Sequence, residues 1–226
     1  MIKAVLFDLD NTLINFSKMK RMCVESAVDA MIDAGLEMGR EDATEKLYEI
    51  YDEKGIEYQQ IFDDFLRAVL GEIDYKILGS AIAVYRKTKL AYLEPYPHVI
   101  PTLTKLSKMG VKLAIVSDAP RLQAWTRLCS LKLHHLFDAV VTFEDTGETK
   151  ATGKPFREVL NRLKMKPMEA LMVGDWPERD IAGAKKMGIK TALLIQEEGE
   201  PVDSSKADYV IRDVSEIVDF VNGQYY

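Results

Sequence analysis

The chain has 226 residues, of which 47% are hydrophobic and 29% charged, enough for one large domain or for a core with a smaller appendage. Its formal net charge of −6 argues against general nucleic-acid binding, which needs a basic face. No apolar run approaches a membrane span, no signal peptide precedes the first element, and the two cysteines lack metal-ligand spacing, so we expect a cytoplasmic protein.

The first predicted element is a short buried strand over residues 3–7, and a long helical stretch follows it. Ser17 is a candidate cap for the first helix, and the apolar residues after it recur with helical spacing. Between residue 17 and about residue 92 no convincing strand occurs. The predicted helices cover residues 17–35, 41–54, 57–70 and 74–92.

Beyond residue 95 the pattern changes to short apolar strands that alternate with helices. Strands are predicted over residues 111–116, 139–143, 169–173, 190–195 and 208–211. Helices are predicted over residues 97–109, 120–131, 155–164, 178–187 and 214–222. This alternation is typical of a parallel sheet covered on both faces. We therefore predict an α/β fold, with a Rossmann-like doubly wound sheet built from residues 1–15 and 95–226 and a small all-helical domain over residues 16–94.

Two acids, Asp8 and Asp10, stand where the first predicted strand ends. Side chains alternate between the faces of a strand, so the two carboxylates would leave the chain on the same side. One interpretation is an ordinary turn, in which Asp side chains bond to the local backbone. The other is chemistry, with one carboxylate ionised as nucleophile or metal ligand and the other held as an acid. The rest of the chain has to decide between them.

Other predicted strands also end in polar side chains, and ligands of such sheets bind at the carboxyl ends of the strands. Ser117 and Asp118 follow the second strand, and Asp175 follows the fourth. Asp8 and Asp175 are candidate ligands of a hard cation such as Mg²⁺, with a backbone carbonyl as a third ligand. As an alternative to these functional roles, Ser117 and Asp175 would each cap the helix that follows. Acids and a hydroxyl at the strand ends, together with a lysine on a connecting loop, are the groups needed for a reaction at a phosphate.

The candidate cation is Lys154, on a loop directly before Pro155. A lone loop lysine is usually solvated, and its interest comes from the predicted anion site. Lys150, four residues earlier, stays open as an alternative. Asp180, near the start of the next helix, either complements the helix dipole or orients the lysine or a metal-bound water.

These residues, in this order, resemble the haloacid dehalogenase superfamily in its phosphatase branch. Residues 8–13 match its first motif, D-x-D-x-T-L, and Ser117 matches the second, a Ser or Thr that ends a strand. Lys154 before Pro155 matches the third, and residues 174–180 match the fourth, G-D-x-x-x-x-D. The helical segment after the first motif looks like the cap domain that the first subfamily carries there.

The resemblance implies that Asp8 attacks phosphorus to form an aspartyl-phosphate, and that Asp10 protonates the leaving oxygen and then activates water. It implies Mg²⁺ as cofactor, bound by Asp8, by the backbone carbonyl of Asp10 and by Asp175. The implied substrate is a small phosphorylated metabolite, with no nucleic acid or membrane partner.

The resemblance further places Ser117, Asp118 and Lys154 at the phosphate, with Thr12 and Asp180 behind the reacting groups. Asp118 departs from the pattern, because many relatives carry Asn there and an acid beside an anion is unfavourable. Trp176 also departs, since many relatives have a small polar residue after the fourth-motif Asp. The Trp would narrow the pocket, contact the cap or lie in an interface.

Other functions of the same fold stay open at this point. A haloacid dehalogenase would keep the first acid but has no use for Asp10 and Asp175. A phosphomutase would need a cap that binds a second phosphate, and Lys18, Lys20 and Arg21 leave this open, with a solvated basic first turn as the alternative. The complete set of acids argues against a non-catalytic binding protein. The aromatic residues of the helical segment are expected to form its core, and a homodimer through them is left open.

Overall fold

The computed structural model describes residues 1–195 and 203–223. By its internal contacts the chain divides into two compact units. One, here called the sheet unit, consists of Met1–Asn15 and the chain from Glu94 onward; the other, the helical unit, is Phe16–Leu93. No helix in the described ranges is long and apolar enough to cross a membrane.

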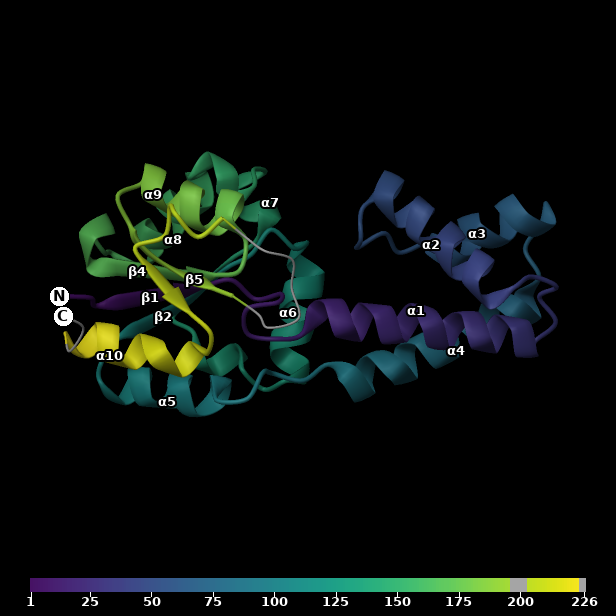
Figure 1. The fold of residues 1–226 in the computed structure, drawn as a ribbon, viewed down its shortest axis with the longest axis horizontal. Helices are drawn as coiled ribbons and strands as arrows, with labels where there is room; N and C mark the ends of the chain where they lie inside the picture. The colour runs from purple at the N-terminus through teal and green to yellow at the C-terminus, as the bar shows by residue number, and fades with distance from the viewer. Residues whose placement is uncertain (196–202, 224–226) are drawn as a thin grey trace. The chain divides into compact units, whose positions relative to one another are not determined.

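The sheet unit is built on a parallel sheet (Figure 1). Within the described ranges its strands are ordered β3-β2-β1-β4-β5-β6. The strands are β1 (Ala4–Phe7), β2 (Lys112–Val116), β3 (Ala139–Val141), β4 (Ala170–Gly174), β5 (Lys190–Leu194) and β6 (Tyr209–Ile211). Each lies within one to two residues of its predicted range. The predicted fold class, a Rossmann-like α/β sheet with an all-helical segment, is confirmed.

Helices cover both faces of this sheet, α5 and α10 on one side and α8 and α9 on the other (Figure 1). Their bounds are α5 (Val99–Lys108), α6 (Arg121–Ser130), α7 (Phe143–Thr146), α8 (Lys154–Leu163), α9 (Ala182–Lys186) and α10 (Ile217–Asn222). Alternate β1 residues Ala4 and Leu6 pack in one apolar cluster with Phe156 and Val159 of α8. Because both faces are covered, the central strand is fully buried and reads as a continuous apolar run.

Two features of the sheet unit differ from the sequence prediction. The single helix expected over residues 178–187 is divided into a π-helix, η4 (Pro177–Ile181), and α9. The short helix α7 was not predicted; Thr142 and Asp145 form a capping box at its start. Short 3₁₀ segments, among them η2 (Lys150–Thr152), lie in the connections. Irregular helices of this kind often occur at functional sites.

The helical unit consists of α1 (Phe16–Asp33), α2 (Arg40–Lys54), α3 (Ile61–Leu70) and α4 (Tyr75–Tyr92). An apolar core joins them, with Phe65, Leu66 and Val28 among its fully buried side chains. Asp74 caps α4 by accepting from the N–H groups of Lys76 and Ile77 at 2.8 and 3.1 Å. The predicted cap at Ser17 is wrong, because α1 begins one residue earlier and Ser17 lies inside it.

Candidate active site

Three polar residues follow directly on three neighbouring strands. Asp8 comes after β1, Ser117 after β2 and Asp175 after β4, and β1 pairs with both of the others. The Asp8 N–H donates to the carbonyl of Val173 at 2.9 Å, and the Ser117 N–H donates to that of Val141 at the same distance. The ladder therefore continues one residue past each strand. This fixes both side chains at the edge where doubly wound sheets bind ligands.

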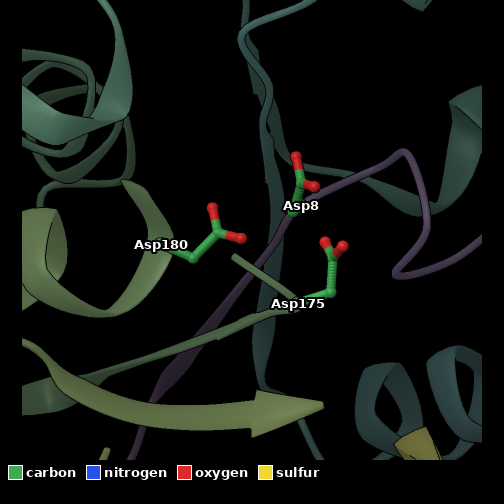
Figure 2. A group of neighbouring side chains, drawn as sticks. All are labelled: Asp8, Asp175 and Asp180. Atoms are coloured by element: carbon green, nitrogen blue, oxygen red, sulfur yellow. The ribbon is translucent and has the colours of Figure 1, made fainter. Parts of the chain in front are cut away.

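Asp8, Asp175 and Asp180 form a compact group of acids. One carboxylate oxygen from each lies within 4.8 Å of the others. Figure 2 shows the three carboxylates turned toward a common space. Burial, reinforced by the charge of Asp180, raises the pKa of Asp175 to about 6. Burial is also the main reason that the pKa of Asp8 lies well above its ordinary value.

The lysine in this group is Lys150, at the start of η2. Its Nζ lies 2.5 Å from Oδ1 of Asp8 and 2.6 Å from Oδ1 of Asp180, and its side chain is 4% exposed. Burial alone would lower the pKa of Lys150, but the charges of Asp180 and Asp8 outweigh it and hold the pKa above its ordinary value. The amine is therefore charged and bound to the strand-end acids.

Lys154, the lysine favoured by the sequence, does not reach the acids. Its Nζ donates to the carbonyl of Thr146 at 3.0 Å and to Glu148 at 2.9 Å, and its side chain is half exposed. The geometry thus replaces Lys154 with Lys150, the alternative left open above. Lys154 begins α8 instead, with Pro155 in the first turn.

A close backbone approach seats Lys150. Gly183 of α9 lies against the carbonyl of Lys150, where an added Cβ would collide with that oxygen. The glycine therefore lets η2 pack directly onto α9. No local pattern in residues 150–155 reveals this contact, because it joins segments more than 30 residues apart.

Asp180 is fully buried, and the chain makes room for its side chain. A Cβ on Gly174 would collide with the carboxylate of Asp180, so a glycine is required at the end of β4. Oδ2 of Asp180 accepts from the Trp176 N–H at 3.0 Å, and its other oxygen lies against Lys150. Gly174 and Asp180 thus together stabilise the turn that begins at Asp175. Asp180 belongs to the acid group itself, and it orients Lys150 rather than Lys154.

Thr12, expected from the resemblance to lie behind the reacting groups, contacts Asp175. Its hydroxyl, which is fully buried, donates to Oδ1 of Asp175 at 3.1 Å. This bond favours the ionised form of Asp175 and opposes the rise of its pKa. The role of Thr12 is therefore to fix the direction of that carboxylate.

Asp10 lies in the turn after Asp8 and does not join the group of three acids. Its carboxylate is one-fifth exposed, and its Oδ2 accepts from Nη1 of Arg127 at 2.9 Å. The sequence did not predict this arginine. The available signal was its spacing: Arg127 falls on the buried face of α6 with Ala124 and Leu128.

Ser117 is buried, and its Oγ accepts from the N–H of Ala119 at 3.1 Å. This bond orders the loop before α6. The N-cap residue of α6 is Pro120, not Ser117. The alternative in which Ser117 is the cap of this helix therefore does not hold. Its place after β2 beside Asp8 remains consistent with phosphate binding.

Asp118 and Trp176, the two departures from the family pattern, are linked through Arg179. Oδ1 of Asp118 accepts from the N–H of Lys150 at 2.8 Å, and its Oδ2 lies 3.4 Å from Arg179. The guanidinium of Arg179 stacks over the Trp176 ring at 4.0 Å. The carboxylate of Asp118 thus binds protein donors and holds η2 in place, and the phosphate contact expected for Asp118 stays a prediction.

The acids and Lys150 together fit a divalent cation. Oxygen donors of three carboxylates suit a hard ion such as Mg²⁺. Lys150 brings one positive charge to a group of three carboxylates, and burial, with the neighbouring acids, raises the pKa values of Asp8 and Asp175. A cation at this place would favour the ionised carboxylates, and a phosphate could then approach Asp8.

The chain resembles known proteins over nearly its whole length. A family model described as haloacid dehalogenase-like hydrolase matches residues 5–194. A protein of Methanocaldococcus jannaschii named glyceraldehyde 3-phosphate phosphatase is 40% identical over 222 residues, covering 98% of this chain and 97% of the relative. Pyrophosphatase PpaX of Halalkalibacterium halodurans is 32% identical and is covered to 97%, as is this chain.

A solved structure shares the arrangement. The crystal structure of a HAD phosphatase from Thermococcus onnurineus superposes with a TM-score of 0.73 at 27% identity, covering 98% of this chain and 99% of that one. The likeness therefore extends over residues of both units and is not confined to the motifs.

Proposed function

The chain belongs to the haloacid dehalogenase-like hydrolases, in their phosphatase branch, and we propose that it hydrolyses a small phosphate monoester through an aspartyl-phosphate intermediate. The observation that carries this mechanism is the contact between the Nζ of Lys150 and the carboxylate of Asp8, inside a group of three acids. A buried acid paired with a fixed cation at a strand end is suited to attack on an anionic substrate.

In the proposed first step, a carboxylate oxygen of Asp8 attacks phosphorus and the bond to the leaving oxygen breaks. Asp10 gives its proton to that oxygen, so the product leaves as an alcohol. In the second step Asp10 takes a proton from water, which attacks the aspartyl-phosphate and releases inorganic phosphate. Asp8 and the proton on Asp10 are then restored for the next turnover.

Charge has to be neutralised for a carboxylate to approach a phosphate dianion. Lys150 does this on one side of Asp8, and the Ser117 hydroxyl and nearby N–H groups bind phosphate oxygens. Asp8, Asp175 and the backbone carbonyl of Asp10 would hold Mg²⁺, with Asp180 beside them. When bound, the ion supplies Lewis-acid stabilisation of the charge that develops on the phosphate.

We further propose glyceraldehyde 3-phosphate as a substrate. The support is the 40% identical relative of that name, which this chain matches from end to end. The substrate is a small monoester whose leaving oxygen is an alkoxide, so it needs the proton that Asp10 is proposed to give.

The mechanism is tested with p-nitrophenyl phosphate in the presence of Mg²⁺, and again after chelation with EDTA. We expect turnover in wild type only with the metal, and a loss of about 10⁴-fold or more in Asp8→Asn. Asp33→Asn is the matched control, because Asp33 is an exposed acid of the helical unit. It should keep wild-type turnover. Turnover that persists in EDTA or in Asp8→Asn would overturn the mechanism.

The same preparation separates the alternative activities of the fold. Conversion of a sugar bisphosphate without net release of phosphate would indicate a phosphomutase. Release of chloride from 2-chloropropionate in Mg²⁺-free buffer would indicate a dehalogenase. We expect neither, because Asp175, whose carboxylate Thr12 orients, is proposed to bind a metal ion that carbon–halogen hydrolysis does not need.

The substrate proposal is tested by comparing kcat/KM for glyceraldehyde 3-phosphate, glycerol 3-phosphate and pyrophosphate. We expect glyceraldehyde 3-phosphate to exceed the other two by at least about tenfold, about 1.4 kcal/mol of transition-state binding. A higher value for pyrophosphate would contradict the proposed substrate while leaving the phosphatase mechanism intact.

A further inference from the structure

Helix α6 carries a charged side chain into the interior of the sheet unit. Arg127 is 1% exposed and is among the largest fully buried side chains of the described residues. Its Nη1 donates to Oδ2 of Asp10 at 2.9 Å. The two residues are 117 positions apart in the chain, so the contact is made only by the fold.

Burying an arginine on a helix face that packs against a core is energetically unfavourable. The guanidinium keeps its charge at all accessible pH values, and removing it from water costs several kcal/mol unless an anion and hydrogen bonds compensate. Ala124 and Leu128 show that this face of α6 is otherwise filled by apolar side chains. The position of this arginine therefore points to a role in the contacts it makes, and one of these is with the carboxylate of Asp10.

We propose that Arg127 is a positioning residue that fixes the carboxyl group of Asp10 and decides which of its oxygens carries the proton. A guanidinium has only donors, so it favours a bare oxygen at Oδ2. The proton that Asp10 gives and takes is therefore placed on Oδ1. This inference rests on the proposed phosphatase mechanism, in which Asp10 is the acid and base.

Fixing that oxygen matters because proton transfer depends on geometry. A general acid has to lie within hydrogen-bond reach of the leaving oxygen, and its contribution to the rate is about 10²- to 10⁴-fold. A carboxyl group that rotates freely about Cβ–Cγ presents the wrong oxygen for part of the time. Asp10 is one-fifth exposed and lies in a turn, and the buried guanidinium of Arg127 restrains the rotation of its carboxyl group by holding Oδ2.

Leaving groups of different basicity provide the test. Departure of a 2,4-dinitrophenolate needs no proton, whereas the alkoxide of glycerol 3-phosphate does. We therefore expect Arg127→Met to lower kcat/KM for glycerol 3-phosphate by about 100-fold and for 2,4-dinitrophenyl phosphate by less than about threefold. Because kcat/KM for both substrates ends at phosphoryl transfer, later hydrolysis of the intermediate does not enter the comparison.

Arg127→Lys is the second variant, since it keeps the charge and most of the length but loses the planar fork. We expect about a tenfold loss for glycerol 3-phosphate and none for the aryl ester, and no further loss when the substitution is added to Asp10→Asn. Should Arg127→Met fail to fold, judged by circular dichroism, Arg127→Lys decides the question alone.

Arg162→Met is the control. It removes a partly exposed arginine that pairs with Asp145 and Glu158, and it should not change the ratio of the kcat/KM values for the two substrates.

The outcomes separate the inference from the mechanism beneath it. Equal losses on both substrates would show that Arg127 only supports the structure, and would overturn the inference. Wild type inactive on both substrates with Mg²⁺ would overturn the proposed function itself. A selective loss on glycerol 3-phosphate in folded Arg127 variants supports both.

Discussion

The two units of the chain treat buried charge in opposite ways. In the helical unit, every residue of which is described, Lys20 is the only charged side chain classed as buried. Its Nζ lies over the Tyr51 ring at 4.0 Å and donates to the hydroxyl of Tyr85 at 3.0 Å. In the sheet unit, by contrast, the buried Lys150 contacts the buried Asp8 and Asp180 near the ends of β1 and β4, and the buried Arg127 contacts Asp10. The buried charged side chains of this unit in the described ranges are Asp8, Arg127, Lys150 and Asp180.

The difference separates stability from chemistry. The apolar core of the helical unit gains free energy from burial alone. For the acids at the strand ends, burial has an unfavourable effect: it disfavours the ionised carboxylates and so raises the pKa of both Asp8 and Asp175. Buried acids with raised pKa values are typical of active sites, where the stability of the surrounding fold offsets their cost.

The largest expected effect separates the two lysines of the η2–α8 segment. Lys150→Met should lower kcat/KM for p-nitrophenyl phosphate by about 10³-fold or more, because Asp8 loses the cation that faces it. Lys154→Met should stay within about threefold, since its amine binds Glu148 at the surface. Steady-state kinetics at saturating Mg²⁺ measures both. Equal losses would show that this difference in burial has no catalytic meaning.

That pair also shows where the sequence sufficed. Strand ends could be predicted, because an apolar run has to stop where a polar residue follows, and this located Asp8, Ser117 and Asp175 correctly. The choice between Lys150 and Lys154 depends on how η2 packs against α9 at Gly183. A packing contact between distant segments leaves no period in the sequence, so the nearer motif match was favoured.

Arg127 and Asp118 illustrate the same limit for charged residues. Arg127 lies on a helix face, and charged side chains on helices are usually solvated, so its burial against Asp10 was not predicted. The resemblance placed Asp118 at the phosphate, but it did not indicate that its carboxylate binds the Lys150 N–H and Arg179. Neighbours in sequence share a loop, but their side chains point to different partners.

The helical unit provides the next test of the comparison. Phe65 is fully buried in its apolar core, so Phe65→Ala should lower the free energy of unfolding by about 3–4 kcal/mol. Turnover of p-nitrophenyl phosphate per folded molecule should stay within about threefold, because no reacting group lies in that core. Urea unfolding followed by circular dichroism gives the first quantity. Tyr75→Ala, at a side chain that is 78% exposed, is the control and should change stability by less than about 0.5 kcal/mol.

The smallest expected effect concerns an acid of the sheet unit away from the strand ends. Asp145 lies 2.9 Å from Arg162 and 3.1 Å from Arg121, and it accepts from the Thr142 N–H. Partial burial would raise the pKa of Asp145, but hydrogen bonds from Arg162 and Thr142 outweigh it and lower the pKa to about 2, from 3.8 in an unperturbed Asp. Unlike Asp8, this carboxylate is more stable as the anion in the folded chain.

A depressed pKa in the folded state contributes stability above the unfolded value, and that contribution is lost as the pH falls. Asp145→Asn should therefore lower the free energy of unfolding at pH 7 by about 1–2 kcal/mol, after allowance for solvent screening. The difference between wild type and variant should be constant down to about pH 5, and roughly half of it should be gone by about pH 3. Urea unfolding across this range measures it, with Asp33→Asn, at an exposed acid of the helical unit, as the control. A difference that stays constant to pH 3 would mean that the arginines do not stabilise the anion, and the contrast with Asp8 would then rest on burial alone.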